Sequence, residues 1–256
     1  MKRAVVFDFF GTLTDPGNEH RRRAVYDATA AVLGIAPDQF WAAVTGSFTE
    51  RATGVLGGTP STLRELAARC GTTPSALVLD EAVTTHRAGA TVLHEPRPGA
   101  LDVLTTLRAH GLRIGVLSDC SSELCEAWDE LPYAGLVDAA VLSWRVGYRK
   151  PDPRGYRAAA DALRVAPEEC WFVGDGGSRE LQGAAAAGMT PVLVANTAYP
   201  DHASFRDDPD AFVPDHVVDD LDAVRGLVDW PSQTAADEGD LERRPPHAHT
   251  WRRRTT

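Results

Sequence analysis

The 256-residue chain has few cysteines. It contains four, which are Cys70, Cys120, Cys125 and Cys170. No two of them form a CxxC pair, and no cluster of Cys and His has the spacing of a zinc site, so neither a disulfide framework nor structural zinc is expected. The thiols are therefore predicted to remain free, as they do in a reducing compartment.

Long apolar runs are also missing. The first apolar run, residues 4–7, comes after Met1 and two basic residues. It is too short for a signal-peptide core or a membrane span. No later stretch is long enough either, so we expect a cytoplasmic protein without a membrane partner. With 43% hydrophobic and 24% charged residues, the composition still allows a sizeable core in one domain or in one domain plus an insert.

Basic residues are fewer than acidic residues, 26 against 36. The formal net charge is −10 and the isoelectric point is about 5.2. This balance argues against nucleic acid and anionic membranes as partners. It leaves an anionic substrate open, because a local cation or metal can reverse the field inside a cleft. The sequence does not indicate an oligomeric state.

Strand-like and helix-like patterns alternate along most of the chain. Short buried strands are predicted at 4–7, 112–117, 137–142, 170–174 and 190–194. Helical patterns separate them at 99–110, 121–130, 153–164 and 178–187. This alternation predicts an α/β fold with a doubly wound, Rossmann-like parallel sheet and helices on both faces.

One long segment lacks strand patterns. It carries helical spacing near 19–33, 37–52, 60–70 and 74–92, between Pro/Gly breakers at 15–17 and 96–99. We therefore predict a core formed by residues 1–16 and 95–230, with a helical cap over residues 17–94. Residues 231–256 are polar and poor in apolar side chains, which predicts a disordered tail.

Polar groups follow the ends of several predicted strands. They are Asp8, Ser118, Lys150 and Asp175. In an open parallel sheet, ligands bind at the carboxyl ends of the strands. Any one of these residues could be an ordinary turn or surface residue. Four in one chain predict an active site.

The segments around these residues resemble four known motifs. Residues 7–15 (FDFFGTLTD) are similar to DxDGTLxD, the first motif of the haloacid-dehalogenase-like hydrolases. Residues 117–119 (LSD) and 149–153 (RKPDP) resemble the second and third motifs. Residues 173–180 (VGDGGSRE) resemble the fourth, GDxxxxD, with Glu in the last position. The resemblance covers roughly residues 4–225, and the helical insert resembles the C1 cap of subfamily I.

The resemblance implies a hydrolase that acts on a small phosphorylated metabolite. Asp8 would attack the substrate and form a covalent aspartyl intermediate, dividing one hard displacement into two easier ones. Ser118 would hydrogen-bond the transferred group, and Lys150 would neutralise charge beside Asp8. The remaining substrate contacts implied by the resemblance are Gly11, Thr12 and Asp119.

The resemblance also implies a Mg²⁺ cofactor. Its ligands would be the side chains of Asp8, Asp175 and Glu180 and the backbone carbonyl of Phe10, since Mg²⁺ prefers oxygen ligands. Glu180 has an alternative explanation as a first-turn acid that complements the helix dipole.

Phe10 departs from the family pattern. It occupies the place of a second Asp, which normally protonates the leaving group and then activates water, and phenylalanine cannot transfer protons. Three hypotheses follow: a phosphatase with another acid or an undemanding leaving group, a metal-independent 2-haloacid dehalogenase, or a weakly active member that binds a phosphorylated ligand. An aromatic residue at position 10 is compatible with the dehalogenase hypothesis, but the carboxylates of Asp175 and Glu180 argue against that hypothesis.

The predicted cap contains no lysine, although the phosphonate-cleaving branch of the family uses a cap lysine as a Schiff base. That branch is therefore set aside. Residues 21–23 (RRR) open the cap and favour a solvated helix face over a grip on a substrate anion. Trp41 and Phe48 are predicted to belong to the core of the cap.

Overall fold

The computed structural model describes residues 1–199 and 208–227, and its centre is a parallel sheet in the order β3-β2-β1-β4-β5-β6. This sheet confirms the predicted Rossmann-like fold class. The strands are β1 (Ala4–Phe7), β2 (Arg113–Ser118), β3 (Ala139–Leu142), β4 (Cys170–Gly174), β5 (Thr190–Val194) and β6 (His216–Val218). Strand β1 lies between β2 and β4, so the loops that follow these three strands lie side by side.

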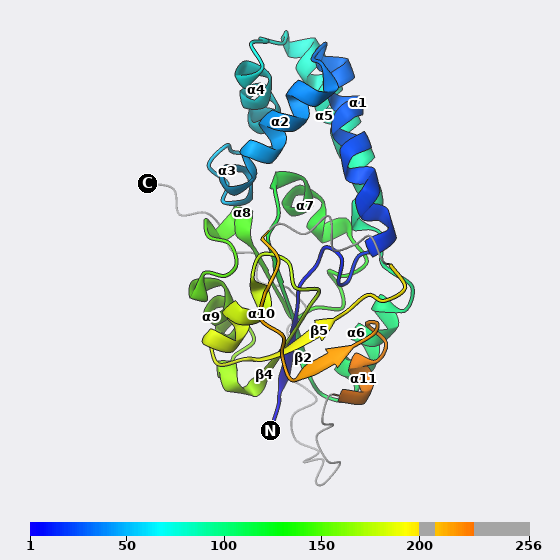
Figure 1. Ribbon diagram of the computed structural model, residues 1–256, viewed down its shortest axis with the longest axis vertical. Helices are drawn as coiled ribbons and strands as arrows, with labels where there is room; N and C mark the ends of the chain where they lie inside the picture. Colours follow the sequence, from blue (N-terminus) through cyan, green and yellow to red (C-terminus); the bar gives the residue numbers. More distant parts are fainter. Residues whose placement is uncertain (200–207, 228–256) are drawn as a thin grey trace.

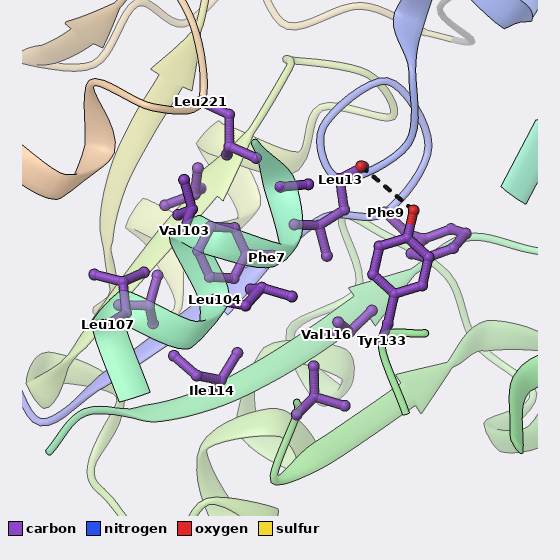
Figure 2. Close-up of a cluster of buried hydrophobic side chains, with 14 of the residues drawn as sticks. Phe7, Phe9, Leu13, Val103, Leu104, Leu107, Ile114, Val116, Tyr133 and Leu221 are labelled. Atoms are coloured by element: carbon purple, nitrogen blue, oxygen red, sulfur yellow. Dashed lines mark hydrogen bonds between the residues drawn. The ribbon is translucent and has the colours of Figure 1, made fainter. Parts of the chain in front are cut away.

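Helices cover both faces of the sheet (Figure 1). Alternate residues of a strand point to opposite faces. Val5 and Phe7 therefore pack on the face covered by α6 (Ala100–Ala109) and α11 (Val224–Leu227). Figure 2 shows Phe7 beside Val103 and Leu104 of α6. Ala4 and Val6 pack on the other face with α9 (Pro153–Ala162) and α10 (Glu180–Ala186). All four β1 side chains are buried, which is why the strand reads as one apolar run.

The segment between β1 and α6 is helical. It contains α1 (Arg22–Leu33), α2 (Pro37–Gly46), α3 (Phe48–Ala52), α4 (Thr59–Arg69) and α5 (Ala76–Ala90), with 3-10 helices at Pro16–Arg21 and Thr91–His94. No strand lies between residues 25 and 90. These helices share an apolar cluster of their own that includes Phe40, Leu63 and Leu66. In Figure 1 they lie above the strand ends that carry the polar residues.

Two chain segments connect this helical insert to the sheet, and they pair with each other. Thr14 forms an isolated antiparallel bridge with Pro96. The Asp15 amide donates to the Glu95 carbonyl at 3.1 Å, and the Arg97 amide donates to the Leu13 carbonyl at 3.0 Å. The insert therefore leaves and rejoins the sheet at one place. The division into core and cap at residues 16 and 95 stays a prediction.

The structure differs from the predicted elements in several places. The helix expected over 37–52 is broken at Ser47, whose hydroxyl donates to the Val44 carbonyl at 3.0 Å and so competes with the helix backbone. The helix expected from residue 19 begins as the 3-10 turn before α1. Strand β6 was not predicted, because three residues are too few to show a period.

The connecting helices α7 (Ser122–Ala127) and α8 (Ser143–Val146) complete the α-helices of the described residues, and short 3-10 helices lie at Trp128–Glu130 and Pro167–Glu169. None of the described helices is long and apolar enough to cross a membrane. The four cysteines are free. The tail predicted to be disordered, residues 231–256, lies outside the described residues.

Candidate active site

Polar side chains gather at one edge of the sheet. Asp8 follows β1 directly, Ser118 ends β2, and Asp175 follows β4. Lys150 follows β3 and the short helix α8. Because β2, β1 and β4 are parallel neighbours, their carboxyl ends lie together, and the connection after β3 returns to the same edge.

Lys150 lies between two of the predicted carboxylates. Its ammonium group donates a very short hydrogen bond to Oδ1 of Asp8 and another, of 2.5 Å, to Oε2 of Glu180. Asp8, Asp175 and Glu180 each place one oxygen within 4.8 Å of the others, and all three are buried. Three carboxylates beside one ammonium leave an excess of two negative charges if all are ionised.

Burial and like charge act together on the acids of this cluster. Burial raises the pKa of Asp8 to about 6, with Lys150 opposing the rise and Asp175 adding to it. Burial and the neighbouring Asp8 raise the pKa of Glu180 well above its ordinary value. Burial lowers the pKa of Lys150, but Asp8 and Glu180 outweigh it, so the net shift is upward. A further positive charge would relieve this repulsion.

The donor set fits a small divalent cation. Carboxylate oxygens are the ligands that Mg²⁺ prefers. The second oxygen of Glu180 accepts from the Gly176 amide at 2.9 Å, and Oδ1 of Asp175 accepts from the Gly177 amide at 3.1 Å, which orients both groups. Gly11 leaves room beside Asp175, since a Cβ there would lie 2.9 Å from its Oδ2. Asp8, Asp175 and Glu180 could therefore hold Mg²⁺.

Glu180 does begin α10, as the helix-dipole alternative requires. It is nevertheless 0% exposed and bonded to Lys150, so its side chain belongs to the carboxylate cluster. A helix acid that served only the dipole would not need a lysine partner.

Two buried hydroxyls, one at the end of β2 and one in the loop after β1, lack a partner among the described residues. They belong to Ser118 and Thr12, each 0% exposed. A buried hydroxyl without a hydrogen bond costs about 1–3 kcal/mol. Gly11, between Phe10 and Thr12, lines the adjoining cavity.

Asp119 serves the loop that carries Lys150. Its Oδ1 accepts from the Lys150 amide at 2.9 Å, and its Oδ2 accepts from Nε of Arg149 at 3.1 Å. Asp119 also lines the cavity. The resemblance implies that Asp119 contacts the substrate, which stays a prediction. In the structure both its carboxylate oxygens accept hydrogen bonds from residues 149 and 150.

A cavity of about 400 Å³ opens above the cluster, between the strand ends and the insert. A pocket of this size suits a small molecule. Asp8, Lys150 and Phe10 line it from the sheet side. The lining residues from the insert include Arg22, Tyr26, Trp41, Phe48 and Arg51. Trp41, predicted to be cap core, packs against that core and faces the cavity as well.

The Phe10 ring occupies the place where the family pattern expects an acid. It contacts Phe9 edge-on at 5.1 Å, and the Arg22 guanidinium carbon lies 4.9 Å from its centroid. The His94 ring is 6.0 Å away, but burial lowers the pKa of His94 to about 4, so this ring is neutral near pH 7. The position therefore supplies no proton to the cavity.

The sequence did not identify two residues that support the first loop. The Asn196 amide donates to the Gly11 carbonyl at 2.9 Å. Arg97 donates to Oδ1 of Asn196 at 2.7 Å and is buried. Asn196 follows β5 in the left-handed region, with φ 53°. The feature of the sequence that could have indicated Asn196 is its position shortly after the end of a predicted strand.

The Rossmann-like α/β fold and this carboxylate–lysine centre are features of a hydrolase that uses an aspartate. A family model described as haloacid dehalogenase-like hydrolase matches residues 2–188. The chain therefore belongs to the haloacid dehalogenase-like hydrolases.

The chain is similar in sequence to proteins named as phosphatases and similar in fold to dehalogenases. Over 170 residues the chain is 31% identical to a glyceraldehyde 3-phosphate phosphatase of Methanopyrus kandleri, covering 64% of this chain and 71% of that protein. It is 36% identical over 130 residues to a phosphoserine phosphatase of Thermus thermophilus, covering 50% and 49%. A 2-haloacid dehalogenase structure from Pseudomonas syringae has a TM-score of 0.64 at 21% identity, covering 89% and 98%, which shows the shared fold alone.

Proposed function

We propose that the chain is a Mg²⁺-dependent phosphatase that acts on a small phosphorylated metabolite through Asp8. The observation that carries this proposal is the buried cluster of Asp8, Asp175 and Glu180 around a single lysine. Its excess negative charge requires a cation before an anionic substrate can approach. Relatives named as phosphatases support the same reaction class.

The chemistry divides into two displacements. A carboxylate oxygen of Asp8 attacks phosphorus, a P–O bond to Asp8 forms, and the bond to the leaving oxygen breaks with its electron pair. Water then attacks phosphorus, which releases inorganic phosphate and restores the carboxylate. The leaving oxygen takes its proton from water or from the substrate, because Phe10 has none to give.

Other side chains stabilise the transferred group. Lys150 neutralises charge beside Asp8, and the unpartnered hydroxyls of Ser118 and Thr12 can donate to phosphoryl oxygens. Asp8, Asp175, Glu180 and the Phe10 carbonyl would hold Mg²⁺, which would offset the charge of the phosphoryl group when bound. The insert would act as a cap that excludes bulk water from the cavity.

Phe10 favours a second candidate, a 2-haloacid dehalogenase, because halide leaves without a proton. In that reaction Asp8 would attack carbon and displace halide, and no cation would be required. The carboxylates of Asp175 and Glu180 would then have no evident purpose, so we rank this candidate below the phosphatase.

The deciding experiment incubates the purified protein with phosphate monoesters and with 2-haloacids, each with Mg²⁺ and with a chelator. A phosphatase loses turnover in the chelator and regains it when Mg²⁺ is added. Halide release that persists in the chelator would overturn the proposal and establish the dehalogenase. A catalytically weak binding protein would release neither phosphate nor halide but would still bind Mg²⁺ and a phosphate ester.

A further inference from the structure

The insert side of the cavity holds a buried arginine without a carboxylate partner. Arg51, on α3, is 6% exposed and lines the cavity. Its guanidinium donates to the hydroxyls of Tyr26 (3.1 Å), Ser121 (2.6 Å) and Ser47 (3.3 Å) and to the Val44 carbonyl (3.2 Å). Within residues 1–199 and 208–227 it forms no ion pair. All its partners are therefore uncharged.

The other lysine and arginine side chains of the cavity are paired with acids. Arg22 bonds Glu19 at 2.8 Å, and Arg23 bonds Asp27 at 2.7 Å. Lys150 lies between two carboxylates of the catalytic cluster. Burying a charge without a counter-ion is energetically unfavourable. Arg51 thus differs from its neighbours because, among the described residues, no acid forms an ion pair with its guanidinium.

Two hydroxyl groups beside Arg51 have protons to donate. The oxygens of Tyr26 and Ser121 each accept a hydrogen bond from Arg51, so their own protons point elsewhere. Both residues line the cavity and are at most 7% exposed, and neither hydroxyl donates to an acceptor among the described residues. Burial raises the pKa of Tyr26, which keeps its proton in place. A guanidinium has five N–H groups, of which four are bonded here, so one N–H and two O–H groups remain.

We propose that Arg51, Tyr26 and Ser121 form a subsite for a carboxylate group of the substrate. The proposal rests on the proposed phosphatase function and narrows its substrate class to small phosphorylated carboxylic acids. One cation balances one negative charge, and Glu123, which also lines the cavity, disfavours a dianion there. The volume of about 400 Å³ restricts the substrate to a short molecule that can reach from Asp8 to Arg51.

The test measures binding of phosphonates, which the enzyme cannot hydrolyse. Titration calorimetry with Mg²⁺ compares 3-phosphonopropionate, which carries a carboxylate, with ethylphosphonate, which does not. Charge-assisted hydrogen bonds of this kind correspond to about 10- to 100-fold in affinity. We expect the wild-type protein to prefer 3-phosphonopropionate by this factor and Arg51→Met to lose the preference while still binding ethylphosphonate.

Two further variants complete the test. Tyr26→Phe removes one hydroxyl from a packed ring, so it should fold even if Arg51→Met does not, and should reduce the preference by about 5-fold. Arg23→Met is the matched control: it removes a cavity arginine that already has acidic partners. It should keep the preference.

Each outcome decides between named alternatives. Equal binding of both phosphonates by the wild-type protein would overturn the subsite. An equal loss of affinity for both in Arg51→Met would also overturn it, because Arg51 would then contact the phosphoryl group. Binding of propionate that requires Arg51, without binding of either phosphonate, would support the carboxylate subsite and overturn the phosphatase function instead.

Discussion

Replacing Phe10 with Asp tests the most unusual feature of the site. A general acid contributes about 10²–10⁴-fold, which is roughly 3–5 kcal/mol at 1.4 kcal/mol per decade. Alkyl phosphates need this contribution because an alkoxide is a poor leaving group, whereas aryl phosphates do not. We therefore expect the wild-type enzyme to hydrolyse aryl phosphates far faster than alkyl phosphates, and Phe10→Asp to accelerate only the alkyl esters.

The structure limits how much the substitution can restore. The Arg22 guanidinium carbon lies 4.9 Å from the centroid of the Phe10 ring. A charge pair about 5 Å apart, at an effective dielectric constant near 20, is worth about 3 kcal/mol. This attraction would lower the pKa of the new Asp and favour its ionised form. Glu19, 2.8 Å from Arg22, cancels part of the effect. We expect a gain of about 10-fold near pH 7, with a larger gain toward pH 5.

The assay is kcat/KM across a series of phosphate esters with increasing leaving-group pKa. Phe10→Asn is the matched control, because it has the size of Asp but cannot act as an acid. Thermal melting checks the fold, since the substitution removes the contact between the Phe9 and Phe10 rings.

A flat profile with rapid alkyl-phosphate turnover in the wild-type protein would refute this reasoning, because another group would then supply the proton. Equal acceleration by Phe10→Asn would refute it as well, since space rather than acidity would be responsible. If neither ester is hydrolysed by either protein while Mg²⁺ and a phosphate ester still bind, the chain is a binding protein.

Three further predictions concern single side chains. Asp8→Asn should abolish turnover of all esters, because an amide cannot form the acyl phosphate, and retained turnover would exclude Asp8 as the nucleophile. In a chelator the same substitution should raise the melting temperature by about 2–4 °C, because it removes one of the crowded negative charges. Asn196→Ala should lower the unfolding free energy by about 1–3 kcal/mol in urea titrations, because the Gly11 carbonyl loses its donor; an unchanged midpoint would contradict this. Burial lowers the pKa of His94 in the folded protein to about 4, below its ordinary value of 6.5. Between these two pH values the unfolded chain binds a proton at His94 that the folded protein does not. The free energy of unfolding should therefore fall by up to about 3 kcal/mol as the pH drops from 6.5 to 4. His94→Phe should lose this slope in urea titrations at several pH values, whereas His110→Gln, at an exposed position, should keep it.

Local patterns in the sequence were sufficient for the class of fold. Strands β1 and β4 are buried on both faces, so their apolar runs are visible without knowledge of their neighbours. Breakers at residues 15–17 and 96–99 also flank the helical segment that lies between Pro16 and His94, although the division into core and cap stays a prediction. The helix break at Ser47 does not follow from the sequence pattern. The Ser47 hydroxyl bonds the backbone of the preceding turn, and helical periodicity does not reveal such competition.

The sequence also singled out Asp8, Lys150, Asp175 and Glu180, which the structure brings together, because motifs that follow strand ends have short spacings. Their catalytic and metal-binding roles stay predictions. The sequence could not place them relative to one another. Lys150 and Glu180 are 30 residues apart and meet at 2.5 Å only because α9 and β4 return the chain to the same edge of the sheet. The pKa shifts of Asp8 and Glu180 depend on that meeting and on burial, which are both long-range properties.

Only the tertiary structure decided the surroundings of Arg51. In the sequence, Arg22 and Arg23 lie three and four residues from Glu19 and Asp27, a spacing that allows pairing along a helix, whereas Arg51 has no acid at this spacing. Folding gives the first two acidic partners and surrounds Arg51 with hydroxyls at the cavity wall. The charge of a side chain is a property of its residue type, but whether that charge is balanced depends on groups brought close by the packing of distant segments.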